Sequence, residues 1–159
     1  MYLARLALVA ALLAPALCSA EDDLPSLSYI AYLERYATVQ PSHQEESLEA
    51  VINMPLVAGD RLDTAREARA EIQLADGSLL WVDQYTTVSF DAVARSRDTA
   101  GDRTVLFLAE GTIMIEVPET IAGAAPTRID SGSETVHLTA AGLYRVSTLR
   151  TGGLRLEVW

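Results

Sequence analysis

This 159-residue chain has two histidines, and these are the side chains that could act as a base for a nucleophilic hydroxyl. Serine and threonine need such a base to react. His43 lies in the polar stretch 41–46, which is typical of a solvated loop, and His137 lies between apolar residues of a predicted strand. The Ser131-Gly132-Ser133 segment is typical of a turn and not of a lipase-type nucleophile elbow. We therefore predict that the protein is not an enzyme.

The sequence predicts no catalytic residue, no metal and no cofactor. Its single cysteine, Cys18, lies in an N-terminal leader, so the remaining chain has no thiol ligand. The 22 acidic residues guarantee chance pairs of carboxylates, but none stands in the ordered loop that calcium sites use. The glycine patterns that cradle phosphate groups are also missing from the sequence.

Aromatic residues provide an alternative chemistry. Trp81 and Tyr85 could form a platform on which sugar rings stack, which would make the chain a carbohydrate- or peptidoglycan-binding module. Tyr29 and Tyr32 are further candidates for the same platform. The competing interpretation of Trp81, which lies in an apolar run, is a core residue or a lone exposed ring. The two interpretations differ in whether the rings lie together on the surface.

The first 20 residues have the three parts of a secretory signal. Arg5 supplies a positive charge, residues 6–17 form an unbroken apolar run, and Cys18-Ser19-Ala20 places small residues before a cleavage point. A run of this length is shorter than the roughly 20 residues that span a membrane. We predict export to the bacterial periplasm by a cleaved signal peptide. An anchor formed by an uncleaved N-terminal helix is the alternative.

The exported part is predicted to be a flexible lead-in over residues 21–28 and one domain over residues 29–159. Without Arg5, 11 of the 12 basic residues remain against 22 acidic ones, a net charge of −11. Such a surface repels phosphate backbones, so we expect no nucleic-acid binding. No later segment is long and apolar enough to span a bilayer, so we expect no stable membrane insertion.

Short strands are the elements that must position these residues. Period-two alternation and β-branched or aromatic content predict strands over residues 29–40, 48–54, 70–74, 78–83, 86–90, 104–109, 112–117, 135–139, 143–149 and 154–159. Residues 94–103 and 118–126 are predicted loops. Short strands at regular spacing are typical of an all-β sandwich, barrel or short solenoid.

Two pairs of glycine and aspartate mark turns between these strands. Gly59 and Asp60 predict a bend between two short extended pieces. Asp76 and Gly77 are the strongest two-residue hairpin signal in the chain. We expect Gly77 to adopt a positive φ, which a β-branched residue cannot do without strain. All four residues are therefore assigned structural roles.

The order and spacing of these segments resemble a group of exported bacterial proteins that carry a FecR-like domain. The shared pattern is a glycine–aspartate turn, an alternating strand, an aspartate–glycine hairpin and an apolar strand. It covers residues 57–62, 69–78 and 79–83, with further similarity over residues 28–39, 50–56, 108–114 and 135–146. The resemblance implies a short-stranded sandwich or a short β-solenoid-like domain after the signal peptide.

The resemblance also implies a non-catalytic module that contacts a protein or cell-envelope partner. In iron–siderophore signalling, FecR proteins relay the state of an outer-membrane receptor to a sigma factor through a cytoplasmic helical segment and one membrane span. A signal peptide stands in place of those parts here, so the sigma-regulating role is not carried over. A strand-like segment up to Trp159 has two interpretations: the terminal strand pairs inside a sheet, or the chain is truncated at its C-terminus.

Overall fold

A computed structural model describes residues 27–95, 102–119 and 125–159. All regular elements in these ranges are strands, so the predicted all-β fold is confirmed. The predicted signal peptide, most of the lead-in, and parts of the loops 94–103 and 118–126 lie outside the described residues. The described ranges contain no helix that is long and apolar enough to cross a membrane.

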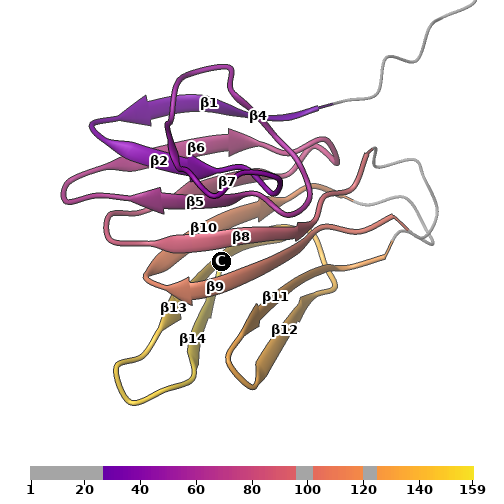
Figure 1. Cartoon of the computed structure of the whole chain (residues 1–159). Helices are drawn as coiled ribbons and strands as arrows, with labels where there is room; N and C mark the ends of the chain where they lie inside the picture. Colours follow the sequence, from indigo (N-terminus) through magenta and orange to yellow (C-terminus); the bar gives the residue numbers. More distant parts are fainter. Residues whose placement is uncertain (1–26, 96–101, 120–124) are drawn as a thin grey trace, which may run out of the picture.

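Fourteen strands of the described residues form two seven-stranded sheets (Figure 1). Sheet A has the spatial order β14 (Leu154–Val158), β13 (Gly142–Thr148), β10 (Thr112–Val117), β7 (Leu79–Val82), β6 (Arg69–Gln73), β1 (Ser28–Glu34) and β4 (Pro55–Leu56). Sheet B has the order β12 (Glu134–Leu138), β11 (Thr127–Ser131), β9 (Val105–Glu110), β8 (Thr87–Ala92), β5 (Arg61–Thr64), β2 (Ala37–Gln40) and β3 (Leu48–Glu49).

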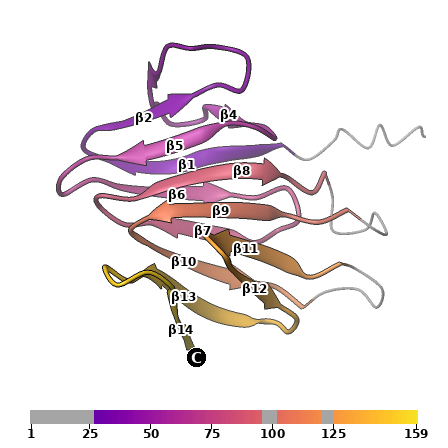
Figure 2. The same cartoon turned by 60° about the horizontal axis from the view of Figure 1, so that its bottom comes forward.

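The chain passes repeatedly between the sheets and advances along the molecule from β1–β4 to β11–β14 (Figures 1 and 2). Paired strands are antiparallel except β9 and β11, which run parallel. This is a short-stranded sandwich, one of the two architectures that the resemblance implied. The chain adds strands first to one sheet and then to the other. Neighbouring strands in a sheet are therefore often distant in sequence, as β7 and β10 are.

One apolar core lies between the sheets. The register of sheet A aligns four fully buried side chains across neighbouring strands: Ile30, Ile72, Leu80 and Ile115. Sheet B contributes a second buried set: Leu62, Val88, Phe90, Leu106 and Leu108. Alternate residues of each strand therefore divide between the core and the outer faces. Burial of each such side chain stabilises the fold by about 1.5–3 kcal/mol.

Residues 29–40, predicted as a single strand, are two strands in different sheets. β1 ends at Glu34, Arg35 has a left-handed φ of 62°, and β2 begins at Ala37. The chain turns over the end of the sandwich at this point. Both strands bury alternate side chains in the same core, so the apolar alternation continues through the bend and does not reveal it.

One other strand prediction is wrong, and one strand was not predicted. Residues 48–54 contain only the two-residue β3, and a turn follows in which Asn53 has a φ of 66°. No strand was predicted for residues 127–131, which form β11 and whose Arg128 and Asp130 pair with each other at 2.9 Å. Ile129 is the one large apolar side chain of that strand and is fully buried. A single apolar residue gives too weak an alternation to predict a strand.

Candidate functional site

The two histidines do not share a site. His43 follows β2 near one side of sheet B, and His137 lies on β12 at the other side, with four strands between β2 and β12. At about 4.8 Å per strand spacing, the two strands are roughly 24 Å apart. Within the described ranges, no group of three or more His, Cys, Asp or Glu side chains could hold a metal ion.

Gly59 and Asp60 hold two loops together. The Asp60 carboxylate, which is only 4% exposed, accepts hydrogen bonds from the N–H groups of Ser42 (3.0 Å) and Val57 (2.9 Å). Gly59 has a φ of 93°, and a Cβ at this position would lie 2.5 Å from Cβ of Ser42. Glycine is therefore required both by the backbone conformation and by the close approach of Ser42.

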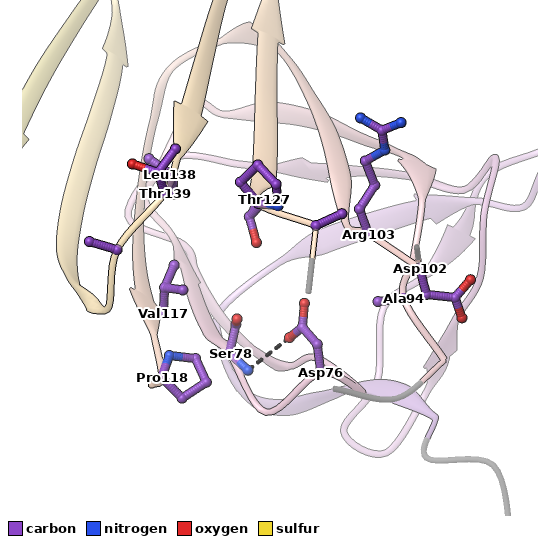
Figure 3. A pocket seen from close by; sticks show the side chains of 13 residues that line it. Asp76, Ser78, Ala94, Asp102, Arg103, Val117, Pro118, Thr127, Leu138 and Thr139 are labelled. Carbon is purple, nitrogen blue, oxygen red and sulfur yellow. Dashed lines mark hydrogen bonds between the residues drawn. The ribbon is translucent and has the colours of Figure 1, made fainter. Parts of the chain in front are cut away.

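The turn at Asp76 and Gly77 closes the hairpin between β6 and β7. Gly77 has a φ of 85°, as predicted, and its N–H donates to the Leu74 carbonyl (3.0 Å). Leu74 N–H donates to the Ser78 carbonyl (2.9 Å), so the loop has three residues, 75–77, and not the two predicted. Asp76 accepts from Ser78 N–H (2.9 Å; Figure 3) and from the Thr104 hydroxyl (2.7 Å). Asp76 thereby joins this hairpin to the segment that enters β9.

A cavity of about 120 Å³ lies beside this turn (Figure 3). Its apolar walls include Val117, Pro118 and Leu138. Small-molecule sites usually measure about 300–1,000 Å³, so this cavity is too small to be one. The Asp76 carboxylate at its edge also has two hydrogen-bond donors already. We therefore assign the cavity no ligand.

Asp102 lines the same cavity and pairs with Arg95. Arg95 Nε lies 3.0 Å from Oδ2 of Asp102. This hydrogen bond lowers the pKa of the Asp102 carboxyl, and desolvation of the carboxyl opposes that shift. The same hydrogen bond raises the pKa of Arg95. Because the folded-state pKa of Asp102 is lowered, the pair stabilises the fold at neutral pH and loses that effect as pH falls below about 4. The pair is exposed, so its contribution is small.

A larger hollow of about 450 Å³ lies on the outer face of sheet A. We call it the sheet A hollow and define it by the five side chains that carry the argument: Tyr32 of β1, Glu71 of β6, Trp81 of β7, Met114 of β10 and Arg145 of β13. Its volume falls within the usual range of ligand sites. It is therefore the strongest candidate for a functional surface.

Strand register places these five side chains in one row. Tyr32 lies opposite Glu71, Glu71 opposite Trp81, Trp81 opposite Met114, and Met114 opposite Arg145. Directly opposed Cβ atoms lie about 4.5–5.5 Å apart. The indole Nε1 of Trp81 donates to Oε2 of Glu71 at 2.8 Å, which fixes one edge of the ring. The row thus presents an aromatic and apolar centre with a carboxylate and a guanidinium.

Further charges surround this row. Glu34, Arg69 and Asp83 also line the hollow. Arg69 Nε lies 3.3 Å from Oδ1 of Asp83. Arg145 is exposed and has no acidic partner within 4.0 Å in the part of the chain that the structure describes. The rim is therefore polar and carries both signs of charge.

The aromatic residues singled out from the sequence come together only in part. Trp81 and Tyr32 line the same hollow, and Tyr29 lies farther along β1, opposite Gln73. Tyr85 lies in the turn between β7 and β8, has a φ of 53°, and does not line the hollow. The structure therefore replaces Tyr85 with Tyr32 as the aromatic neighbour of Trp81.

Sequence reasoning missed Met114 and Arg145 as members of a site. Period-two alternation within the predicted strand 112–117 puts Met114 on the face opposite Ile113 and Ile115. The missing information was the strand order, since β7, β10 and β13 become neighbours only in the folded sheet.

Comparison with known proteins identifies the family. The family model described as "FecR protein" matches residues 60–159, which is more than half of the chain. No curated protein and no solved structure matches the chain. The matched residues include β6, β7, β10 and β13, which supply four of the five side chains of the sheet A hollow.

Proposed function

Because the chain belongs to the FecR protein family, we propose that it is a non-catalytic periplasmic module that acts by binding a protein partner of the cell envelope. The family is regulatory and non-enzymatic. The signal-like leader supports the proposed export. The sheet A hollow is the proposed contact surface.

The difference between the two outer faces supports this surface most directly. The central row of sheet A carries Tyr32, Trp81 and Met114. A corresponding row of sheet B carries Thr38, Asp63 and Thr87, which are all polar. Aromatic residues, Met and Arg are enriched where protein interfaces gain most of their binding energy. The sheet A face has that composition at its centre and charged residues at its rim.

Site-specific crosslinking in the envelope tests the proposal. A photoreactive phenylalanine analogue at Met114 should give a discrete adduct with one protein, because this position lies in the hollow. The same analogue at Ser89, on the outer face of sheet B, is the matched control and should give no such adduct. Adding Trp81→Ala should reduce the Met114 adduct by roughly tenfold or more, since central aromatic side chains dominate interface energies.

Two results would count against this contact surface. One is an equal pattern of adducts from Met114 and Ser89, which would indicate random collisions. The other is a Met114 adduct that is unchanged by Trp81→Ala in a variant with an unchanged melting temperature.

A saccharide is the second candidate partner, favoured by the shared position of Trp81 and Tyr32 in one hollow. Glu71, which accepts from the indole, could also accept from sugar hydroxyls. The chain has two tryptophans, so Trp159→Phe leaves Trp81 as the only indole reporter. Saturable quenching of its fluorescence by soluble peptidoglycan fragments would favour this candidate. A flat titration would reject it.

A further inference from the structure

The sheets expose two long edge strands. The four edges are β3 and β4, with two residues each, and β12 and β14, with five each. β14 lies at the outer edge of the molecule (Figure 2). Its Leu156 and Val158 lie opposite the buried Val146 and Tyr144, on the core side of sheet A, yet they are 43% and 58% exposed. The core side of this edge is therefore uncovered.

The backbone of β14 also has free hydrogen-bonding groups. Trp159 and Leu143 exchange both backbone hydrogen bonds, with N···O distances of 3.0 and 3.4 Å. Pairs in an antiparallel ladder alternate, so Arg155 and Glu157 also direct their backbone groups at β13. Leu156 and Val158 direct theirs away from β13, toward the free edge. Among the described residues, no backbone group bonds to the N–H or C=O of either residue at that edge.

The charged side chains of β14 favour one register for pairing with a second copy of this strand. The strand reads Leu154-Arg155-Leu156-Glu157-Val158, with Arg155 and Glu157 on the outer face. In an antiparallel pair of two copies centred on Leu156, each Arg155 faces a Glu157. Centring on residue 155 or 157 instead places like charges opposite each other, which is destabilising. The register centred on Leu156 is also the one that uses the free backbone groups of Leu156.

We propose that β14 is a homodimer interface, in which a second copy of this chain pairs antiparallel with it about Leu156. Leu156 of each copy exchanges both N–H···O bonds with Leu156 of the other. Leu154 faces Val158 on the core side, and the Leu154 N–H, which donates to Oε2 of Glu134 within one chain, exchanges that bond for the Val158 carbonyl of the other copy. Two pairs between Arg155 and Glu157 form on the outer face. Such a contact is self-complementary, as a two-fold interface requires.

The contact has a functional consequence. The two-fold axis stands perpendicular to the joined sheet, so both copies present the outer face of sheet A on the same side. The dimer therefore displays two sheet A hollows in one surface, which would raise the avidity for a repetitive partner. The dimer itself does not depend on the function proposed for the hollow.

The dimer should be weak. A five-residue edge is small beside the 1,200–2,000 Å² that stable interfaces usually bury. Each chain has a net charge of −10, so the two copies also repel each other at long range. That repulsion is screened beyond about 8 Å at physiological ionic strength, whereas the opposed charges of β14 are in direct contact.

Sedimentation velocity of the purified chain from about 1 µM to about 500 µM tests the proposal. The wild-type chain should shift from monomer to dimer over this range. Arg155→Glu and Glu157→Arg should each raise the dimer dissociation constant by roughly tenfold or more, because each places like charges opposite each other. Both positions are exposed, so the melting temperature should stay near the wild-type value for Arg155→Glu. It should fall slightly for Glu157→Arg, because that substitution places a second guanidinium opposite Arg145 of β13.

Mixing the two variants separates the proposed pairing from other causes. Arg155→Glu presents two acidic residues and Glu157→Arg presents two basic ones, so an equimolar mixture should form a heterodimer. The chain with both substitutions should self-associate like the wild type. A wild-type chain that stays monomeric over the range would overturn the proposal. Single variants that dimerise normally, or a mixture that does not associate, would also overturn it.

Discussion

At the scale of single residues, the two turns depend on their glycine and aspartate residues, which the sequence shows directly. They also depend on hydrogen-bond partners far away in the sequence, which it does not show. The glycine and aspartate of each turn were recognisable from residue type, because positive φ and short polar side chains favour turns. The hydrogen-bond partners of Asp60 were not recognisable from the sequence, since Ser42 lies 18 positions away. The same applies to Asp76 and Thr104, which are separated by 28 positions.

Gly59→Ala tests how much of this stability comes from the close approach of Ser42. Gly132→Ala is the matched control, because Gly132 also has a positive φ but a Cβ there would meet nothing within 4 Å. Gly132→Ala should cost about 1 kcal/mol of unfolding free energy, from backbone strain alone. Gly59→Ala should cost roughly 2–4 kcal/mol, because the overlap with Ser42 adds to the strain. Urea denaturation measures both, and equal losses would contradict the steric argument.

At the scale of elements, hydroxyl groups fix the point where the chain crosses from β7 in sheet A to β8 in sheet B. Thr86 is buried, and its hydroxyl accepts from Thr112 N–H at 3.0 Å. The Thr64 hydroxyl accepts from Thr86 N–H at 3.0 Å and donates to the Asp83 carbonyl at 2.6 Å. These bonds join the ends of β5, β7, β8 and β10. Sequence patterns gave the strands of this region but not the bonds that connect them.

Thr86→Val keeps the side-chain shape and removes the hydroxyl. The Thr112 N–H would then lose its partner in a partly buried position, which should cost about 1–3 kcal/mol. Thr86→Ser is the control, since it keeps the hydroxyl and should recover most of that loss. Thermal unfolding monitored by circular dichroism compares the two variants. A serine variant as unstable as the valine variant would assign the effect to packing and not to the hydrogen bond.

At the scale of the whole molecule, both sheets share one core, and they should unfold together. Phe90, on β8, is among the largest fully buried side chains. Phe90→Ala should lower the unfolding free energy by about 3–5 kcal/mol, from lost burial and the cavity left behind. Phe107→Ala, on the outer face of β9, should cost about 1 kcal/mol. Tryptophan fluorescence and far-ultraviolet circular dichroism should give the same midpoint for each variant, whereas separate midpoints would contradict a single cooperative core.

The sequence indicated some of the side chains of the sheet A hollow but not how they come together. Trp81 and Tyr32 were singled out as aromatic residues, and alternation placed Met114 away from the core. Their assembly into one row required the register between β1, β6, β7 and β10. Tyr85 is the other aromatic residue of the predicted platform, but it lies in the turn after β7 and does not line the hollow.

The sequence by itself determined the all-β class, the alternation between core and surface, and the positive φ at Gly77, because these properties depend on residues within a few positions of one another. It also carried enough of the family pattern for the FecR resemblance. Tertiary structure decided the division of residues 29–40 between two sheets, the strand order, the sheet A hollow and the free edge at β14. Side-chain alternation is the same in every strand that faces the core, so it cannot specify which strands become neighbours.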